Sequence, residues 1–373
     1  MIKIIPRYIF KEFIPPFIIG MGFFTFIFIL NPILRLVDLI IVKNVDLISV
    51  LKLFFYLLPS TLAIVFPMAT LVAILVAYGR LSTDLEIIAL RACGINYFKI
   101  FLPAIWFGII VSIFGSIFND TILPEGNFAF KKLYQEIVQK KPLTEIPEHT
   151  LTALGNRIVG IEKINHKENK MSGIVIIEKD ERWNIRTIIA KTGKWVETYE
   201  KKLEKNKVIQ IMRLQLEDGV IQQAEGNIFQ QFSNINFKRM IINFTEVITY
   251  FFEEEKGSRE KNVKELINEI KKIKNSSGNV TRLLIELHKR FSIPFATLAF
   301  VLIGAPLGII TKRSAKSVSL GISAILIIVY YIFYTLGESL ARQEKLNEFF
   351  GLWLPNFIFA LAGGIYIYFL NKK

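Results

Sequence analysis

The chain has 373 residues, of which 52% are apolar, and its mean hydropathy is +0.42. The apolar residues gather in six uncharged runs, each near or above the roughly 18 residues that suffice to cross a bilayer. These runs are 13–30, 53–78, 100–118, 291–311, 317–337 and 349–370. The pattern excludes a cytosolic enzyme, a disordered chain and a secreted disulfide scaffold, and it predicts an α-helical polytopic membrane protein with six transmembrane helices, three before and three after a large polar block.

The formal net charge of +14 is divided evenly along the chain. Residues 121–290 carry 30 Lys and Arg against 23 Asp and Glu, and the remainder carries 16 against 9, so each part has a net charge of +7. Basic residues beside membrane spans are what the positive-inside rule demands. Those in the polar block are spread over strand-like segments without a basic stripe, so nucleic acid is not an expected partner.

The orientation follows from Lys and Arg in the short loops. Eleven of them lie on the side of the two chain ends and five lie on the opposite side. We therefore expect a multi-pass protein of the inner membrane with both termini in the cytoplasm and residues from about 121 to 285 in the periplasm. The first apolar run is too long for a signal-peptide core, and no small-residue cleavage pattern follows it.

Charged residues follow the outer end of the first span. Arg35 and Asp38 lie three apart in LRLVDL, on one helical face, with Lys43 just beyond. Snorkelling of Arg35 to the membrane interface is one explanation. The alternative is a basic rim, to which Lys131 after the third span would contribute, that meets the phosphates of an anionic lipid.

The loop between the second and third spans reads GRLSTDLEIIALRACGINYFK. Thr83 and Glu86 have the spacing of a capping box, in which each side chain satisfies the backbone amide of the other. Acidic residues at a helix start are favourable, and Gly94 is placed to end the helix in a left-handed conformation. The loop therefore predicts a short helix near residues 82–94.

Leu85, Ile88 and Ala89 give this short helix an apolar stripe. One interpretation is an interfacial helix that rests on lipid. The other is a coupling helix that fits a groove on a motor protein and offers Glu86 to a basic residue there.

The polar block alternates as β structure does, with Gly, Asn, Asp and Lys clusters between segments rich in Ile, Val and Phe. The expected strands are Arg157–Ile164, Gly173–Glu178, Ile185–Ala190, Val208–Glu217 and Asn236–Phe251. Such a series predicts an inserted all-β domain of the sandwich or jelly-roll kind. Helices are expected on either side of it, at Asn127–Lys140 and Asn262–Lys274.

The expected domain plan therefore has three parts. Residues 1–120 hold the first three spans, 121–285 the β domain, and 286–373 the last three spans. The fourth span begins ELHKRFSIPFATLAFVLIGAPLGI, with charged residues at its entry and a GxxxG step, Gly304 and Gly308, that permits close contact between helices.

The sequence contains few candidate catalytic residues. The three histidines stand in no HExxH pattern, and there is no GxxxxGK[ST] phosphate loop and no GxSxG elbow. The single cysteine, Cys93, excludes an intrachain disulfide and a multi-cysteine metal site. We expect no catalytic residue, no metal and no cofactor, which favours transport or scaffolding over catalysis.

Four segments together resemble the lipopolysaccharide-export permeases of the LptF/LptG type. They are GRLSTDLEIIALRACGI, ELHKRFSIPFATLAFVLIGAPLGI, YYIFYTLGESLA and LWLPNFIF. The resemblance covers the whole chain, because that family also has three spans, an outer β-jelly roll and three more spans.

The resemblance implies a permease subunit of an ABC transporter. Its partners would be a second homologous permease, a cytoplasmic ABC ATPase dimer, periplasmic jelly-roll bridge proteins, and lipopolysaccharide or a related glycolipid as cargo. It places ATPase coupling at Asp84, Glu86, Leu90 and Arg91, and contacts to the lipid at Arg35, Asp38, Lys43 and Lys131.

Physical reasoning agrees that a chain without an ATP site needs an external motor to move such a lipid. Exposing each buried CH₂ costs roughly 0.8 kcal/mol, so a lipid with several acyl chains must stay covered along its route. We therefore expect an apolar interior in the β domain. Two other hypotheses remain: a static membrane scaffold whose β domain binds a partner protein, and an intramembrane hydrolase, which the lack of charged residues within the six runs disfavours.

Overall fold

The structure is a computed structural model. It describes residues 4–41, 45–140, 149–154, 157–165, 170–179, 185–203, 207–225, 231–244, 256–276, 278–310 and 315–372. The chain divides into a helical unit, Met1–Leu34 with Lys52–Lys131 and Lys256–Lys373, and a second unit, Arg35–Leu51 with Lys132–Glu255.

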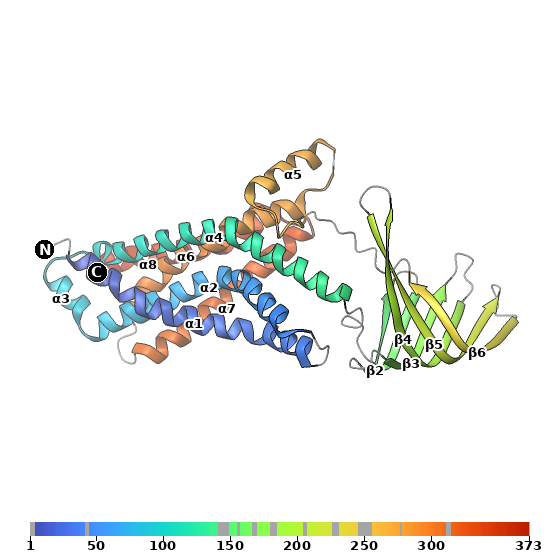
Figure 1. The fold of residues 1–373 in the computed structure, drawn as a ribbon. Helices are drawn as coiled ribbons and strands as arrows, with labels where there is room; N and C mark the ends of the chain where they lie inside the picture. Colours follow the sequence, from blue (N-terminus) through green and yellow to red (C-terminus); the bar gives the residue numbers. More distant parts are fainter. Residues whose placement is uncertain are drawn as a thin grey trace. The chain divides into compact units, whose positions relative to one another are not determined.

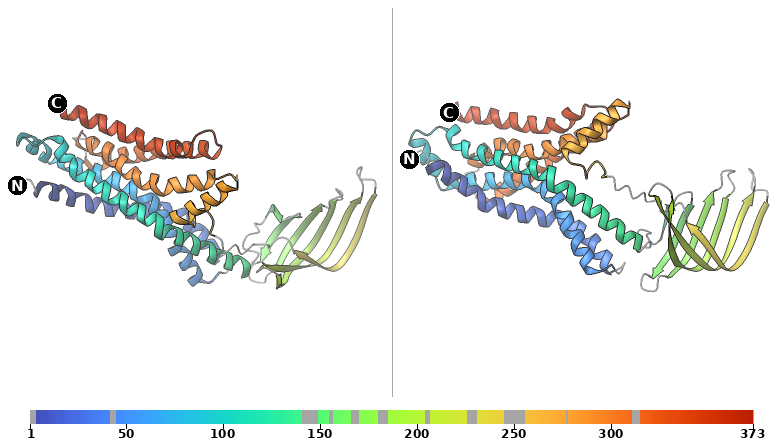
Figure 2. Two further views of the ribbon diagram at one scale, coloured as in Figure 1. Left: turned by 90° about the horizontal axis from the view of Figure 1, so that it is seen from above. Right: turned by 45° about the horizontal axis from the view of Figure 1, so that its top comes forward.

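Helices dominate the first unit (Figure 1). In chain order they are α1 (Ile4–Ile41), α2 (Leu47–Thr83), α3 (Glu86–Ala92), α4 (Tyr97–Lys140), α5 (Val263–Asn275), α6 (Thr281–Ile310), α7 (Ala315–Arg342) and α8 (Glu348–Lys372). Within the described residues, six of them are long and apolar enough to cross a membrane, which confirms the predicted polytopic fold. Both chain ends and α3 lie at one end of this unit, and α5 lies toward the other (Figures 1 and 2).

The third span is longer than the sequence predicts. The expected separate helix at 127–140 is the continuation of α4, which carries Pro103 and Pro124 inside it. The polar stretch between the two expected helices does not loop out because it packs on α2. A Cβ added at Gly126 would lie only 2.9 Å from Cγ of Pro59, so the two helices touch closely there.

Small residues set the closest helix contacts. Gly304 and Gly308 both face α2, where a Cβ at Gly308 would lie 2.8 Å from Cβ of Tyr78. The GxxxG step therefore packs α6 on α2, as close packing in a membrane requires. The most apolar window of α2 is 78% buried, against 17% for α1 and 22% for α7, so α2 is a central helix and the other two are peripheral.

Polar side chains between the helices bind backbone carbonyl groups. Ser112 Oγ donates to the carbonyl of Pro294 at 3.0 Å, and Asn356 Nδ2 donates to the carbonyl of Ser292 at 2.8 Å. Lipid offers no hydrogen bonds, so polar side chains inside a helix bundle are satisfied by contacts of this kind.

The second unit contains an antiparallel sheet. Its described strands are β1 (Thr150–Leu154), β2 (Arg157–Asn165), β3 (Lys170–Lys179), β4 (Ile185–Leu203), β5 (Lys207–Glu225) and β6 (Gln231–Phe244). Each pairs with the next in an up-and-down order, β1 to β6. An all-β domain inserted between the third and fourth spans is thereby confirmed. β1 was not predicted, and β4 extends 13 residues beyond the predicted end at Ala190. The end of the expected last strand, 245–251, lies outside the described residues.

One face of the sheet is apolar. Alternate residues along the strands are buried, as the period of two in a strand requires: Ile174 and Ile176 on β3, Ile188 and Ala190 on β4, Leu214 and Leu216 on β5. Only glycine fits at position 219, because a Cβ there would clash with the ring of Phe237 on β6. The expected apolar interior of this domain is therefore present.

Candidate functional site

The first candidate region is α3 and the turn before it. The predicted capping box is absent: Thr83 is the last residue of α2 and its hydroxyl donates to the carbonyl of Gly79 at 2.9 Å. The chain then reverses at Leu85, which has a φ of +61° and makes no side-chain cap. The prediction was wrong because α2 continues through the Thr83 position and uses its hydroxyl internally.

The other end of α3 follows the prediction. Gly94 has a φ of +80°, its amide bonds the carbonyl of Arg91 at 2.9 Å, and the amide of Ile95 bonds the carbonyl of Leu90 at 3.1 Å. This pair of bonds is a Schellman motif, which favours glycine at the left-handed position. The Arg91 guanidinium lies 4.4 Å from the ring centroid of Tyr97.

The apolar stripe of α3 is turned away from the rest of the chain. Ile87 is 2% exposed and Leu90 packs on the same core cluster. Leu85 and Ile88 are 62% and 54% exposed, and Ala89 is exposed as well. Exposed apolar side chains beside a carboxylate are a surface suited to a lipid or a protein partner.

Glu86 is tied to two other helices. The hydroxyl of Tyr8, on α1, donates to Glu86 Oε1 at 3.0 Å and accepts from Arg80 Nη2, on α2, at 3.1 Å. Arg80 Nη1 also pairs with Glu12 at 2.7 Å, and its Nε lies 3.6 Å from Asp84. This polar cluster, Tyr8, Glu12, Arg80, Asp84 and Glu86, links α1, the end of α2 and α3.

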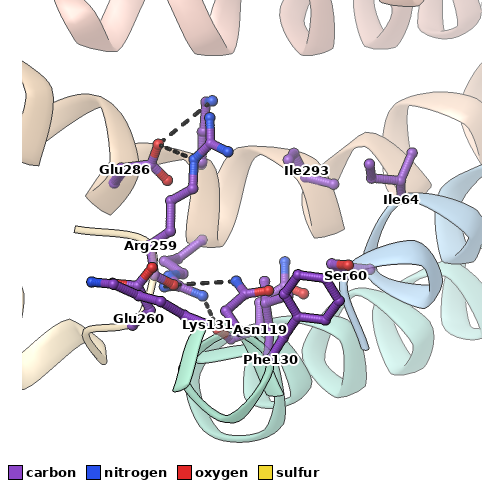
Figure 3. Close-up of a pocket in the computed structure, with 14 residues that line it drawn as sticks. Ser60, Ile64, Asn119, Phe130, Lys131, Arg259, Glu260, Glu286 and Ile293 are labelled. Atoms are coloured by element: carbon purple, nitrogen blue, oxygen red, sulfur yellow. Dashed lines mark hydrogen bonds and ion pairs between the residues drawn. The ribbon is translucent and has the colours of Figure 1, made fainter. Parts of the chain in front are cut away.

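The second candidate region is a cavity of about 370 Å³ in the part of the helical unit near α5 (Figure 3). Residues of α2, α4, a short turn and α6 line it: Ser60, Ala63, Ile64, Asn119, Leu123, Asn127, Phe130, Lys131, Arg259, Glu260, Glu286, Lys289, Arg290 and Ile293. Its volume lies in the usual range for small-molecule sites, about 300–1,000 Å³.

Arg290 fixes the turn Gly257–Glu260 against α4. Its side chain is buried, with the residue only 4% exposed. Nη2 donates to the carbonyls of Arg259 and Lys261, each at 2.9 Å, and Nη1 donates to the carbonyl of Asn119 at 2.5 Å. Arg259 and Glu260 are thereby held at the cavity.

The start of α5 strengthens the same turn. Asn262 Oδ1 accepts from the amide of Glu265 at 2.8 Å, and Glu265 Oε2 accepts from the amide of Asn262 at 2.8 Å, which makes a capping box. Burial alone would raise the pKa of the Glu265 carboxyl. Hydrogen bonds from Lys256 and the Asn262 amide, with the charges of Lys256 and Lys261, outweigh burial and lower that pKa below its ordinary value.

The polar atoms of the cavity are incompletely paired. Among the described residues, Asn119 Oδ1, Glu260 Oε2 and Arg290 Nε are buried without a hydrogen-bond partner. Leaving a buried polar group unpaired costs about 1–3 kcal/mol. Such groups need hydrogen-bond partners from outside the chain, which ordered water or a ligand in the cavity supplies.

The ion pairs that line the cavity are loose. Lys131 lies 3.6 Å from Glu260, and Glu286 lies 3.7 Å from Arg259 and 3.8 Å from Lys289. These distances exceed those of hydrogen bonds. Lys289 is bound more tightly outside the lining, with Nζ 2.6 Å from Glu338 Oε1.

The expected lipid contacts belong to different units. Arg35 and Asp38 are exposed on α1, in the part of that helix that belongs to the second unit, whereas Lys131 lies at the cavity of the helical unit. Lys43 lies outside the described residues. The basic rim therefore stays a prediction. No group of three or more His, Cys, Asp or Glu in the described chain has the arrangement of a metal site.

Sequence reasoning missed the partners of Glu86 and the turn at the cavity. Tyr8 lies 78 residues from Glu86, and Arg290 lies 171 residues from Asn119, so no local pattern relates them. The sequence does contain a signal for the start of α5, because Asn262 and Glu265 have capping-box spacing, as Thr83 and Glu86 also do.

One of the comparisons with known proteins covers nearly the whole chain. A family model described as "Lipopolysaccharide export system permease LptF/LptG" matches residues 7–370. An uncharacterized protein of Rickettsia prowazekii (strain Madrid E) is 25% identical over 195 residues, which are 50% of this chain and 52% of that protein. The chain thus matches about half the length of this curated relative.

Proposed function

Because the chain belongs to the family of LptF/LptG lipopolysaccharide-export permeases, we propose that it is one permease subunit of an ABC transporter. The transporter extracts lipopolysaccharide, or a related glycolipid, from the inner membrane and passes it to a periplasmic bridge toward the outer membrane. A second homologous permease completes the membrane part. ATP is hydrolysed on a separate cytoplasmic ATPase dimer, which docks on α3.

The observation that carries the proposal is the outward face of α3. Leu85 and Ile88 offer exposed apolar area, and Asp84 and Glu86 lie beside it. The hydrogen bond from Tyr8 uses only Oε1 of the Glu86 carboxylate, so Oε2 can accept from a basic residue of the ATPase. Leu90 and Arg91 act from the inner side, where they hold the helix end in place.

The peripheral helices support a partner in the membrane. The exposed side chains of α1 and α7 are large and apolar, among them Ile19, Phe26, Ile325 and Leu336. In the proposal, the second permease and the travelling acyl chains meet these faces. The apolar face of the sheet then covers the acyl chains in the periplasm, which avoids the roughly 0.8 kcal/mol for each CH₂ exposed to water. Arg35, Lys43 and Lys131 are proposed to meet the lipid phosphates, with Asp38 beside Arg35 at the same site.

The test reverses the charge at α3. Native mass spectrometry of the wild-type particle should find this chain, one homologous permease, two ATPase subunits and a phosphorylated glycolipid. Glu86→Lys should lose the ATPase subunits and reduce lipid export at least tenfold, because a buried charge pair with the partner becomes repulsive. Glu125→Lys, at an exposed site on α4, is the matched control and should export normally.

Two results would contradict the proposal. Normal export by Glu86→Lys would remove the coupling role from α3. A wild-type chain that carries only bulk phospholipid and no ATPase, reproducibly in several mild detergents, would indicate a static scaffold.

A further inference from the structure

We infer that the cavity between α2, α4, the turn Gly257–Glu260 and α6 binds the headgroup of a membrane phospholipid that carries both a phosphate and a primary ammonium group. The inference concerns a lipid held by this chain, and it does not depend on the proposed transport.

The cavity lies where the apolar helix segments end. Asn119 directly follows the third uncharged run, 100–118, and Arg290 directly precedes the fourth, 291–311. One part of the lining is apolar, with Ala63, Ile64 and Ile293, and the other part is charged. The boundary between apolar and charged segments is the depth of the lipid headgroups. A ligand there needs one apolar and one polar end, as a phospholipid has.

The charge of the lining favours a phosphate. Four basic side chains, of Lys131, Arg259, Lys289 and Arg290, face two carboxylates. Because Glu338 outside the lining binds Lys289, the lining keeps an excess of about one positive charge. The ion pairs within the lining are loose at 3.6–3.8 Å. Arg290 contributes a buried Nε–H without a partner, and a phosphate oxygen is the strong acceptor that suits a guanidinium donor.

The unpaired acceptors require a donor on the same ligand. Asn119 Oδ1 and Glu260 Oε2 are buried and accept no hydrogen bond. Within the described chain, Glu260 Oε2 has only the loose ion pair with Lys131 Nζ, at 3.6 Å, so a purely anionic group would satisfy Arg290 Nε and leave both oxygens without a hydrogen-bond donor. An ammonium group with its three N–H donors satisfies both oxygens and neutralises part of the Glu260 charge. A trimethylammonium group has no N–H and cannot do so.

The turn holds Glu260 ready for this contact. The amide of Glu260 bonds the carbonyl of Gly257 at 3.0 Å, and the Glu260 carboxylate folds back over Gly257 into space that a Cβ would fill. Arg290, which donates to two carbonyls of this segment, fixes its position. The carboxylate is thus preorganised before a ligand arrives.

The experiment compares two lipids that differ only at the headgroup nitrogen, which carries three N–H donors in one and three methyl groups in the other. The full chain in mild detergent is delipidated, mixed with dioleoyl phosphatidylethanolamine or dioleoyl phosphatidylcholine, and examined by native mass spectrometry. We expect one phosphatidylethanolamine to be retained per chain, with at least a tenfold preference over phosphatidylcholine. Equal retention of the two lipids, or a preference for phosphatidylglycerol over both, would overturn the inference.

Two variants locate the binding. Ala63→Phe fills the apolar side of the cavity and should lower retention at least fivefold, whereas Ala362→Phe, at an exposed site on α8, should retain the lipid. If Ala63→Phe does not fold, the isosteric Glu260→Gln decides the matter. It should lower the preference for phosphatidylethanolamine at least threefold, and an unchanged preference would overturn the assignment.

Discussion

At the scale of single residues, the hydroxyl of Tyr8 has an unusual position. It is the one atom of the described polar cluster that bonds both Arg80 on α2 and Glu86 on α3, at 3.1 and 3.0 Å. Through this hydroxyl, a displacement of α3 acts on α1 without passing through the apolar core. Tyr8 is 39% exposed, so its hydroxyl can be removed with little change in packing.

Tyr8→Phe should therefore separate ATP hydrolysis from transport. One hydrogen bond to a charged group is worth about 1.5–3 kcal/mol, less at an exposed site. We expect lipid export per ATP to fall about three- to tenfold in reconstituted vesicles, with the ATPase still bound and the melting temperature nearly unchanged. Tyr368→Phe, at an exposed tyrosine of α8, is the control. Unchanged export per ATP in Tyr8→Phe would show that the hydroxyl has no part in coupling.

At the scale of elements, α5 and its turn form a polar structure on the helical unit. The capping box of Asn262 and Glu265 starts α5, and the amide of Val263 bonds Asp120 Oδ1 on α4 at 2.7 Å. Leu266 is fully buried below it. The stability of α5 thus depends on a small number of hydrogen bonds and on the burial of one apolar side chain. One of the hydrogen-bond acceptors, the Glu265 carboxylate, can be protonated.

The stability of α5 should depend on pH through Glu265. Its folded pKa is lowered, so its stabilising effect is complete above the pKa of an unfolded glutamate, about 4.3, and is lost as pH falls through the folded value. Hydrogen exchange of the first α5 amides, corrected for intrinsic rates, should rise below pH 4.5. In Glu265→Gln this rise should disappear. A rise of equal size in Glu265→Gln would assign the effect to another group.

At the scale of the whole molecule, much of the fold was predictable because membrane spans must be long and apolar and half-buried strands must alternate in polarity. Six uncharged runs gave the spans, and period-two alternation gave the sheet, since each signal repeats over many residues. The left-handed end of α3 followed from Gly94 alone. The bond between Tyr8 and Glu86 and the bond between Arg290 and Asn119 were not predictable, because they join residues 78 and 171 positions apart.

The orientation can be measured with the natural cysteine. Cys93 is exposed and adjoins α3, and it is the single cysteine of the chain. A membrane-impermeant maleimide should label it in inverted inner-membrane vesicles and not in intact spheroplasts. Ser276→Cys in a Cys93→Ser background, just after α5, should show the reverse. Labelling of Cys93 in intact spheroplasts would place α3 outside and overturn the orientation.

The bond from Arg290 to the carbonyl of Asn119 has a consequence for how the protein is made. The two residues are 171 positions apart, and ribosomes add about 5–20 residues per second, so α4 waits roughly 10–30 s for α6. In the proposed orientation the sheet crosses the membrane during that interval, while α2 faces lipid on the side that α6 later covers. The first three spans are thus a half-built bundle whose completion waits on translocation of the sheet. A cell with slowed secretion would accumulate this half-bundle and expose it to membrane proteases.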